Sequence, residues 1–403
     1  MTLLHPKIEP TFFGEPDAEP LIREARRLRR RGALGISVTV VIVGTGFGLV
    51  VGLWPGKPVL PRQATTTRPG ASQSSAAAAG VIPKTPGALA VSPNGDLYVV
   101  DTGRDQILRH SANGEFEVIA GTGKRGFSGD GDLAIDAKLD LSQFATSSGI
   151  AVAPNGTVYF SDSGNDRVRA VLKNGDIETV GGGGTQALPT RPGEQVSARG
   201  ASLGSPIGLT LGPNNELYIA ANFIVRLTPT GRLAWVAGTN RSQPAVCSAT
   251  TCAMREQNFN SAGDLAFDGD GDLVVTSGGF PGVGWGIGEV RTNGTLVEFG
   301  NCRGEGGKAA ALVPATGGSV ICAGQGGLLR IKNGGESTTP MSGRRALSAA
   351  LGAGRDGPFF GGDGIAVGPN GAIYVDTGPL ASATPNAILK LNPSGTARAL
   401  WKS

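Results

Sequence analysis

The feature that most constrains this chain is a motif that recurs six times between residue 86 and the C-terminus. Each copy has a short run of small apolar residues, then a tight turn of the Pro-Asn-Gly type, then a second apolar run. Asn and Gly accept the positive φ angles that such turns need, so each copy predicts short antiparallel strands. The first turns of the six copies fall at Gly95, Gly156, Asn215, Gly271, Gly318 and Gly371.

The interval between these turns and the four short strands expected in each copy are typical of the blades of a β-propeller. One blade leaves both faces of its sheet uncovered, so we expect the blades to stack in a ring. The 66 glycines and the few aromatic residues agree with many turns and short strands. The first copy begins at an inner strand and the last ends at an outer one, so no strand exchange is expected to close the ring. The sequence therefore predicts an all-β, six-bladed propeller over residues 81–403, in which 81–85 can help closure.

The repeats resemble the NHL repeat family. The resemblance is strongest in Gly149-Ile-Ala-Val-Ala-Pro-Asn-Gly156, Tyr159-Phe-Ser-Asp162 and Gly164-Asn-Asp-Arg-Val-Arg169. Asn165-Asp166-Arg167, and Arg104-Asp105-Gln106 in the first copy, stand where the family usually has Asn-His-Arg, a motif that copies three to six lack. The resemblance, including a loop at 126–131 similar to one common in bacterial NHL proteins, implies an extracytoplasmic binding domain of a bacterial protein. Other members of the family are lyases and lactonases.

An uncharged apolar run from Ala33 to Trp54 precedes the repeats. At ~1.5 Å per residue it spans roughly 33 Å as a helix, enough to cross a bilayer core. Six arginines within residues 23–31 come directly before it. The positive-inside rule then predicts a basic cytoplasmic arm over 1–31, a transmembrane α-helix over 32–54 and an extracytoplasmic remainder. We therefore expect a single-pass protein of the cell membrane. A cleaved signal peptide is the alternative, but its apolar core is shorter.

Glycines four residues apart, Gly44, Gly48 and Gly52, would line one face of that helix and let a second copy approach closely as a homodimer. The alternative is that glycine is simply common in membrane helices.

Residues 55–80 are rich in Pro, Ala, Ser and Thr, which predicts a disordered linker. We expect this tether to join the ring near the face that carries its long loops.

The charge of the propeller argues against nucleic-acid binding. From residue 81 onward the chain has 26 basic and 27 acidic residues, and a nucleic-acid-binding face needs a basic excess.

The chain has 2 histidines, His5 and His110. This count excludes a three-histidine zinc site and argues against a catalytic histidine. We therefore assign no catalytic or metal-ligating residue and no cofactor. The alternatives are a lyase or hydrolase that holds a divalent metal in the channel, and a structural scaffold of the envelope.

Two clusters of carboxylates offer weaker alternatives for a cation. Asp268-Gly-Asp-Gly-Asp272 resembles the start of a calcium loop, but Gly279 stands where an EF-hand has glutamate. This stretch also aligns with the turn of the other copies, so a turn is expected, with Ca²⁺ as the alternative. Asp130 and Asp132 lie in a long loop and can offer further carboxylates. Asp101 and Asp162 end second strands and can face a ligand, but such residues more often tie strands together.

The four cysteines would all lie outside the cytoplasm, where disulfides form. We expect one bond within a short loop and one near the fifth copy, with free thiols or metal ligation as the alternatives. The expected pairs are Cys247–Cys252 and Cys302–Cys322.

The connections of a four-stranded blade alternate between two faces of the ring. The first-to-second and third-to-fourth turns are short here and define the turn face. The other connections are long and define the loop face, where binding is usually placed. They cover residues 121–147, 181–206, 238–262, 278–287, 300–312 and 335–362. The candidate ligand-binding residues for a protein, peptide or glycan partner are Phe127, Phe223, Trp285, Phe359, Phe360, Arg104 and Asp166.

Overall fold

A computed structural model describes the ranges 36–43, 46–53, 80–111, 114–141, 149–221, 223–238, 251–253, 262–268, 270–280, 284–290, 295–300, 311–315, 318–324, 327–332, 339–340, 364–377 and 386–403. The chain divides into two compact units, Met1–Ser75 and Ala76–Ser403. Each unit is described by itself below.

The first unit contains a hairpin where the sequence predicts a transmembrane helix. Strands β1 (Ile36–Val43) and β2 (Gly46–Leu53) pair antiparallel, from Ile36 with Leu53 to Val43 with Gly46. The local reason is composition, because β1 consists mainly of β-branched residues, which favour strands. Within the described ranges, no helix has both the length and the apolar character needed to cross a membrane.

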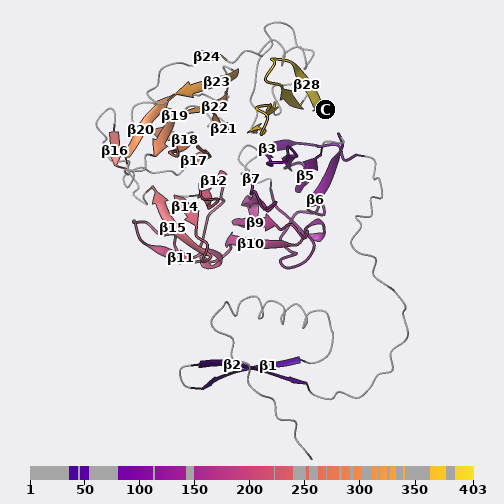
Figure 1. Cartoon of the computed structure of the whole chain (residues 1–403), viewed down its shortest axis with the longest axis vertical. Helices are drawn as coiled ribbons and strands as arrows, with labels where there is room; N and C mark the ends of the chain where they lie inside the picture. The colour runs from indigo at the N-terminus through magenta and orange to yellow at the C-terminus, as the bar shows by residue number, and fades with distance from the viewer. Residues whose placement is uncertain are drawn as a thin grey trace, which may run out of the picture. The chain divides into compact units, whose positions relative to one another are not determined.

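The second unit is a ring of six antiparallel sheets, the blades (Figure 1). Blade 1 consists of β3 (Pro86–Val91), β4 (Leu97–Asp101), β5 (Gln106–His110) and β6 (Phe116–Ala120). Blade 2 consists of β7 (Ile150–Val152), β8 (Val158–Asp162), β9 (Arg167–Val171) and β10 (Ile177–Gly182). Blade 3 consists of β12 (Leu209–Leu211), β13 (Leu217–Ala220), β14 (Ile224–Leu227) and β15 (Arg232–Ala237), with β11 (Gln195–Ser197) added outside β15.

Blades 4 to 6 repeat this arrangement. Blade 4 consists of β17 (Ala262–Phe267), β18 (Leu273–Phe280), β19 (Gly284–Val290) and β20 (Thr295–Gly300), with β16 (Thr251–Ala253) added outside β20. Blade 5 consists of β21 (Ala311–Ala315), β22 (Ser319–Gly324), β23 (Gly327–Lys332) and β24 (Thr339–Pro340). Blade 6 consists of β25 (Ile365–Val367), β26 (Ile373–Asp376), β27 (Ala387–Leu391) and β28 (Ala397–Lys402). The predicted six-bladed propeller is confirmed.

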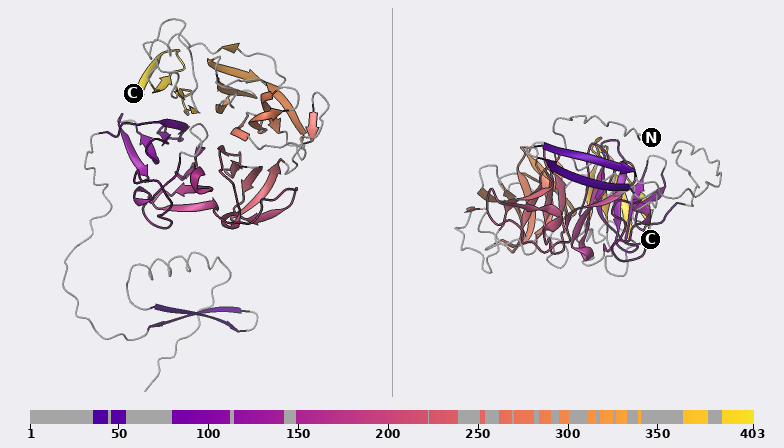
Figure 2. Two further views of the ribbon diagram at one scale, coloured as in Figure 1. Left: turned by 180° about the vertical axis from the view of Figure 1, so that it is seen from behind. Right: turned by 90° about the horizontal axis from the view of Figure 1, so that it is seen from below.

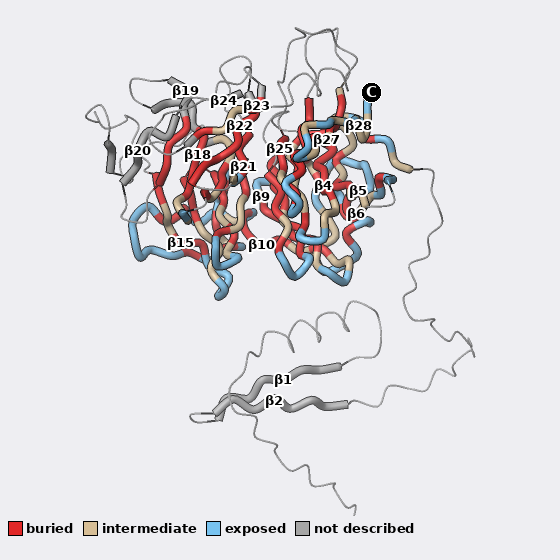
Figure 3. The backbone as a smooth tube through the Cα atoms, turned by 45° about the horizontal axis from the view of Figure 1, so that its top comes forward, coloured by how far each residue is buried: buried red, intermediate tan, exposed pale blue. Residues whose placement is uncertain are grey.

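The turns fall where the repeats predict them. All six turn positions have positive φ: 91° at Gly95, 87° at Gly156, 58° at Asn215, 86° at Gly271, 60° at Gly318 and 76° at Gly371. A tight turn of this kind reverses the chain direction within a few residues, so the first and second strands of each blade pair with each other. The strands bury their side chains against neighbouring blades, while the exposed residues concentrate in the connections (Figure 3).

The ring closes by packing, without exchange of a strand. The inner strands follow one another as β3, β7, β12, β17, β21 and β25, and β25 lies again beside β3. Blade 6 lies beside blade 1 in Figure 1 and in the left view of Figure 2. One apolar cluster joins Leu108 and Phe116 of blade 1 to Tyr374 and Ile388 of blade 6. This agrees with the expectation from the sequence.

Glycine at the start of an inner strand lets neighbouring blades approach. A Cβ at Gly149 would lie 2.6 Å from the backbone nitrogen of Leu209 in the next blade, too close for a real side chain. In blade 4 the same place holds Asp264, whose Oδ2 instead accepts a hydrogen bond from the backbone N–H of Leu312, at 2.8 Å. Desolvation by burial raises the pKa of Asp264 to about 6. This carboxylate therefore joins blades 4 and 5.

Two connections between blades share a local structure, and we call them strap A (residues 121–141) and strap B (residues 183–206). Each contains a short 3-10 turn, η1 (Ala134–Asp136) in strap A and η3 (Ala198–Gly200) in strap B. The N–H of Ala134 donates to the carbonyl of Gly175 at 2.8 Å, and that of Ala198 donates to Gly231 at 3.1 Å. Each strap thus reaches the turn before the outer strand of the blade that follows it.

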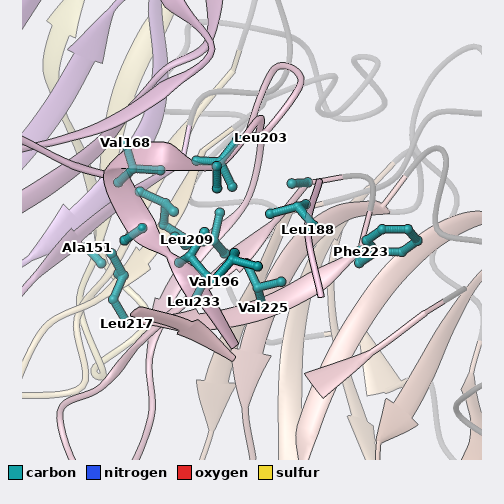
Figure 4. Packing of buried hydrophobic residues seen from close by; sticks show 14 residues of the cluster. Ala151, Val168, Leu188, Val196, Leu203, Leu209, Leu217, Phe223, Val225 and Leu233 are labelled. Atoms are coloured by element: carbon teal, nitrogen blue, oxygen red, sulfur yellow. The ribbon is translucent and has the colours of Figure 1, made fainter. Parts of the chain in front are cut away.

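The pattern Ala-x-x-Ala-x-Leu explains the two straps. Its apolar members are buried between blades in both cases: Ala134, Ala137 and Leu139 in strap A, and Ala198, Ala201 and Leu203 in strap B. Figure 4 shows strap B residues Leu188, Val196 and Leu203 packed with residues of blades 2 and 3. The middle of each strap therefore runs along the outer edge of a blade, and only its ends lie on the loop face.

The chain reaches the ring on the side opposite to the one we expected. The N–H of Val81 donates to the carbonyl of Phe116 at 3.0 Å, at the first residue of β6 and next to the turn between β5 and β6. The following residues cross to Asp101, whose carboxylate accepts the N–H groups of Lys84 and Thr85 at 2.9 Å. The linker therefore joins at the turn-face edge of blade 1, because residue 81 pairs with the outer strand before the chain reaches the inner one.

Candidate functional site

Exposed apolar side chains mark the region of interest. In the described part of the chain the large apolar residues on the surface are Ile82, Phe127, Leu133 and Ile135. Three of them belong to strap A, which lies against blade 2. Because burying such side chains is favourable in water, a strap that leaves three of them exposed is the natural place to look for binding.

Phe127 is held between strap A and blade 2. The guanidinium of Arg167 lies over its ring, 4.0 Å from the centroid, and that of Arg169 lies at 4.9 Å. The ring is still 43% exposed, and the neighbouring Lys124 is exposed as well. Cation–π contacts of this kind orient an aromatic ring. The loop face of blade 2 thus presents a fixed aromatic ring beside positive charge.

A buried arginine holds the segment that carries Phe127. The side chain of Arg169 is fully buried. Its Nη2 donates to the carbonyl of Ser128 at 3.0 Å and to Oδ1 of Asp130 at 3.0 Å, and its Nη1 lies 3.5 Å from Oδ2 of Asp162. Blade 1 has Leu108 at the equivalent place in the repeat. Arg169 therefore stands where blade 1 has an apolar core residue, and its hydrogen bonds hold strap A against blade 2.

Asp162 is the second buried charge of this arrangement. Its Oδ1 accepts the N–H of Asp140 at 2.7 Å and the side-chain amide of Asn165 at 2.8 Å. Desolvation raises its pKa to about 6, although these hydrogen bonds and Arg169 act in the opposite direction. The amide of Asn165 also donates to the carbonyl of Gly126 at 2.9 Å. Asp162 therefore ties the second strand to both ends of strap A, the tying role that the sequence favours.

The two motif residues predicted to bind ligand make contacts within the ring. Arg104 donates from Nη1 to the carbonyl of Ile82 and to Asp101, so it anchors the start of the propeller. Asp166 has a positive φ of 53°, and its Oδ1 accepts the N–H of Ser205 in strap B at 2.7 Å. Both residues lie on the loop face, but they position its connections.

The predicted aromatic residues have different outcomes. Phe223 is only 6% exposed and packs in the core cluster under strap B (Figure 4), so it is not a surface anchor. It is buried because strap B covers the end of blade 3. Trp285 lies in β19, but its side chain is outside the described residues, as are Phe359 and Phe360 altogether. Of the predicted aromatic residues, Phe127 is thus the one that the structure places on the surface.

The cysteine pairs stay predictions. Cys322 is fully buried on β22 and is not a free thiol. Its expected partner Cys302 lies outside the described residues, as does Cys247, and Cys252 lies in β16. The pairing is therefore untested.

Two of the carboxylates considered for a cation, Asp268 and Asp130, make local hydrogen bonds. Oδ1 of Asp268 accepts the N–H groups of Asp270 and Asp272, at 2.9 and 3.0 Å, which forms the expected turn. Oδ1 of Asp130 accepts from Arg169. Within the described ranges, no group of three or more metal-ligating side chains lies together. The calcium alternative remains untested.

Leu133 and Ile135 are not among the residues singled out from the sequence, where residues 121–147 are treated only as a long connection on the loop face. The recurrence of Ala-x-x-Ala-x-Leu at 134–139 and 198–203 is the signal that would have revealed the straps. That pattern fixes the alanines and leucine inward, so the intervening residues must point outward.

Comparison with known proteins agrees with the ring and its repeats. Residues 59–172 match the family described as the teneurin NHL domain. Teneurin-1 of Mus musculus is 36% identical over 100 residues, which cover 22% of this chain and 4% of that protein. Teneurin-3 of Danio rerio is 33% identical over 168 residues, which cover 37% of this chain and 6% of that protein. The chain thus spans a small part of the length of these relatives.

Solved propellers show lower similarity. A streptogramin B lyase structure aligns with a TM-score of 0.48 and 14% identity, covering 80% of this chain and 85% of that one. A gluconolactonase from Xanthomonas campestris aligns with a TM-score of 0.45 and 12% identity, covering 74% and 85%. Similarity at this level carries no information about chemistry. Repeats and ring together define a six-bladed β-propeller built from NHL-type repeats. The family match over residues 59–172 and the teneurin relatives support an NHL-repeat family for these repeats.

Proposed function

We propose that this chain is a membrane-anchored, extracytoplasmic binding or sensing module that presents the loop face of its propeller to a protein, peptide or glycan partner. The observation that carries the proposal is Phe127, an aromatic ring left 43% exposed although two arginines fix its position. A rigid ring that carries an exposed aromatic residue loses little entropy on binding. Buried aromatic residues are also frequent anchors of interfaces.

The proposed anchor is a transmembrane helix over residues 32–54, with residues 1–31 in the cytoplasm. In hydrocarbon every backbone polar group must be bonded within the protein, which a helix achieves alone. The two-stranded hairpin of the structure leaves the outer edges of β1 and β2 without partners in the described residues. The arginines before the apolar run set the orientation. Gly44, Gly48 and Gly52 would then lie on one face, where a second copy can pack.

The place where the linker joins supports a loop face that is free to bind. Val81 pairs with Phe116 at the turn-face edge of blade 1. The attachment point is therefore at the opposite side of the ring from Phe127. A linker of residues 55–80 has a span of roughly 30 Å if flexible, which leaves space for a partner.

The test compares matched variants of the two faces. The solubilised full chain is used to capture binding proteins or glycans from its native envelope, and the affinity of each recovered partner is then measured. Replacing Phe127 with Ala should weaken binding about 30-fold, the equivalent of 2 kcal/mol. Asn155→Asp, on the turn face, keeps the side-chain oxygen that accepts the N–H of Thr157 and should leave binding unchanged. The proposal is wrong if Asn155→Asp weakens binding and Phe127→Ala does not.

A further inference from the structure

Leu133 and Ile135 form an exposed apolar pair on the outer rim, away from Phe127. Their side chains are 50% and 51% exposed. Leu133 pairs with Asp176 in an isolated antiparallel bridge at the turn before β10, so it lies toward the turn face. The buried Ala134 separates the two residues and anchors them to Gly175. The pair therefore stands on a fixed part of strap A.

Strap B shows that the fold does not require apolar residues at these places. The residue before the 3-10 turn has φ −63° and ψ 132° at Leu133, and φ −60° and ψ 126° at Ser197. The residue after the turn has φ −75° and ψ 149° in strap A, and φ −77° and ψ 150° in strap B. The same backbone thus carries Ser197 and Arg199 where strap A carries Leu133 and Ile135. The backbone of the strap therefore does not require apolar residues at these two positions.

Acidic residues surround the pair. Asp132 and Asp136 are exposed and flank it in sequence, and Asp176 lies beside Leu133. Neither Asp132 nor Asp136 takes part in an ion pair within the described residues. The nearest cation in the strap, Lys138, runs back along Gly126: its Cδ lies 3.5 Å from where a Cβ on that glycine would be. One further cation, the exposed Lys173, lies in the same turn as Gly175 and Asp176. The rim around the apolar pair therefore carries three carboxylates against Lys173 and keeps a negative excess.

We propose that Leu133, Ile135, Asp132 and Asp136 form a docking surface, the rim patch, for a peptide segment of another protein in which apolar side chains are flanked by Lys or Arg. The two apolar side chains would be covered by those of the segment, and the flanking cations would meet the carboxylates. The same charge argues against docking on a bilayer of anionic lipid, because Asp132 and Asp136 would be repelled. The rim patch is separate from the loop face and does not depend on the partner proposed there.

The probe for the experiment is a displayed library of random twelve-residue peptides, selected on the full chain in detergent. The test variant is Leu133→Ser with Ile135→Arg, which gives strap A the residues of strap B. Because strap B folds with these residues, the variant should keep the circular dichroism and thermal unfolding of the wild type. The control variant, Phe127→Ala, alters the loop face and leaves the rim patch intact.

We expect selection on the wild type to enrich peptides in which apolar residues are flanked by Lys or Arg. The affinity of a selected peptide should fall at least tenfold in the Leu133→Ser/Ile135→Arg variant, a typical effect of truncating buried anchors. It should be unchanged in Phe127→Ala. Asp132→Asn with Asp136→Asn should weaken binding and reduce its dependence on salt.

Three results would overturn the rim patch. The first is enrichment of acidic or purely polar peptides. The second is binding that Phe127→Ala abolishes and Leu133→Ser/Ile135→Arg does not, which would leave the loop-face proposal standing. The third is a wild-type chain, freed of detergent, that binds vesicles of zwitterionic lipid through Leu133 and Ile135 while no peptide is enriched, since this would identify the surface as a lipid contact.

Discussion

Replacing Arg169 with leucine tests how strap A is held. The change removes the hydrogen bonds from Nη2 to Ser128 and Asp130 and leaves Oδ2 of Asp162 without its cation. Removing one partner of a buried ion pair costs about 3–5 kcal/mol. A buried leucine suits this place in the repeat, as Leu108 shows in blade 1, and offsets part of that cost. We therefore expect a loss of about 3 kcal/mol in the free energy of unfolding.

The assay is urea unfolding of the full chain, followed by circular dichroism. Arg167→Leu is the matched control, because Arg167 lies on the same strand and over the same ring but is partly exposed. It should cost less than about 1 kcal/mol. Combining Arg169→Leu with Asp162→Asn should cost at least about 1 kcal/mol less than the sum of the single changes. Equal losses for Arg169→Leu and Arg167→Leu would refute the role given to the buried pair.

Three further predictions follow from the sequence and the fold. A reporter fused after Ser403 should be active only outside the cytoplasm, and activity of that fusion inside would reverse the proposed orientation. After denaturation without reductant the four cysteines should show no titratable thiol, whereas two or more thiols would contradict the pairs Cys247–Cys252 and Cys302–Cys322. Because the pKa of Asp264 is raised to about 6, the folded state binds its proton more tightly than the unfolded state does. The free energy of unfolding should therefore fall by about 2–3 kcal/mol from this group as pH rises from about 4 to about 6. Unfolding measured across this range should show a smaller fall in Asp264→Asn, and identical pH profiles would contradict the prediction.

The blades could be predicted from sequence because their signal is local. A turn such as Val152-Ala-Pro-Asn-Gly156 specifies positive φ at its glycine, and the apolar residues on either side can then pair in one register only. The same signal recurs in every copy, and in the fifth copy it is the turn at Gly318.

The site was harder to predict because its contacts join distant parts of the chain. Nothing local shows that Arg169 is buried, since its partners Ser128 and Asp130 belong to the preceding connection. In the sequence Phe223 looks like an aromatic anchor on the surface of a loop. Only the packing of strap B over blade 3 places it in the core. The edge at which Val81 pairs is likewise set by a contact with a residue distant in sequence, Phe116.

The most direct test of the proposed function is hydrogen–deuterium exchange of the full chain with and without a captured partner. The account predicts that binding slows exchange in the loop-face segments that surround Phe127, residues 122–128 and 163–167. The turn-face segments 92–96 and 153–157 should exchange at the same rate in both samples. Protection of those turns, with no change around Phe127, would contradict the claim that this propeller binds through its loop face.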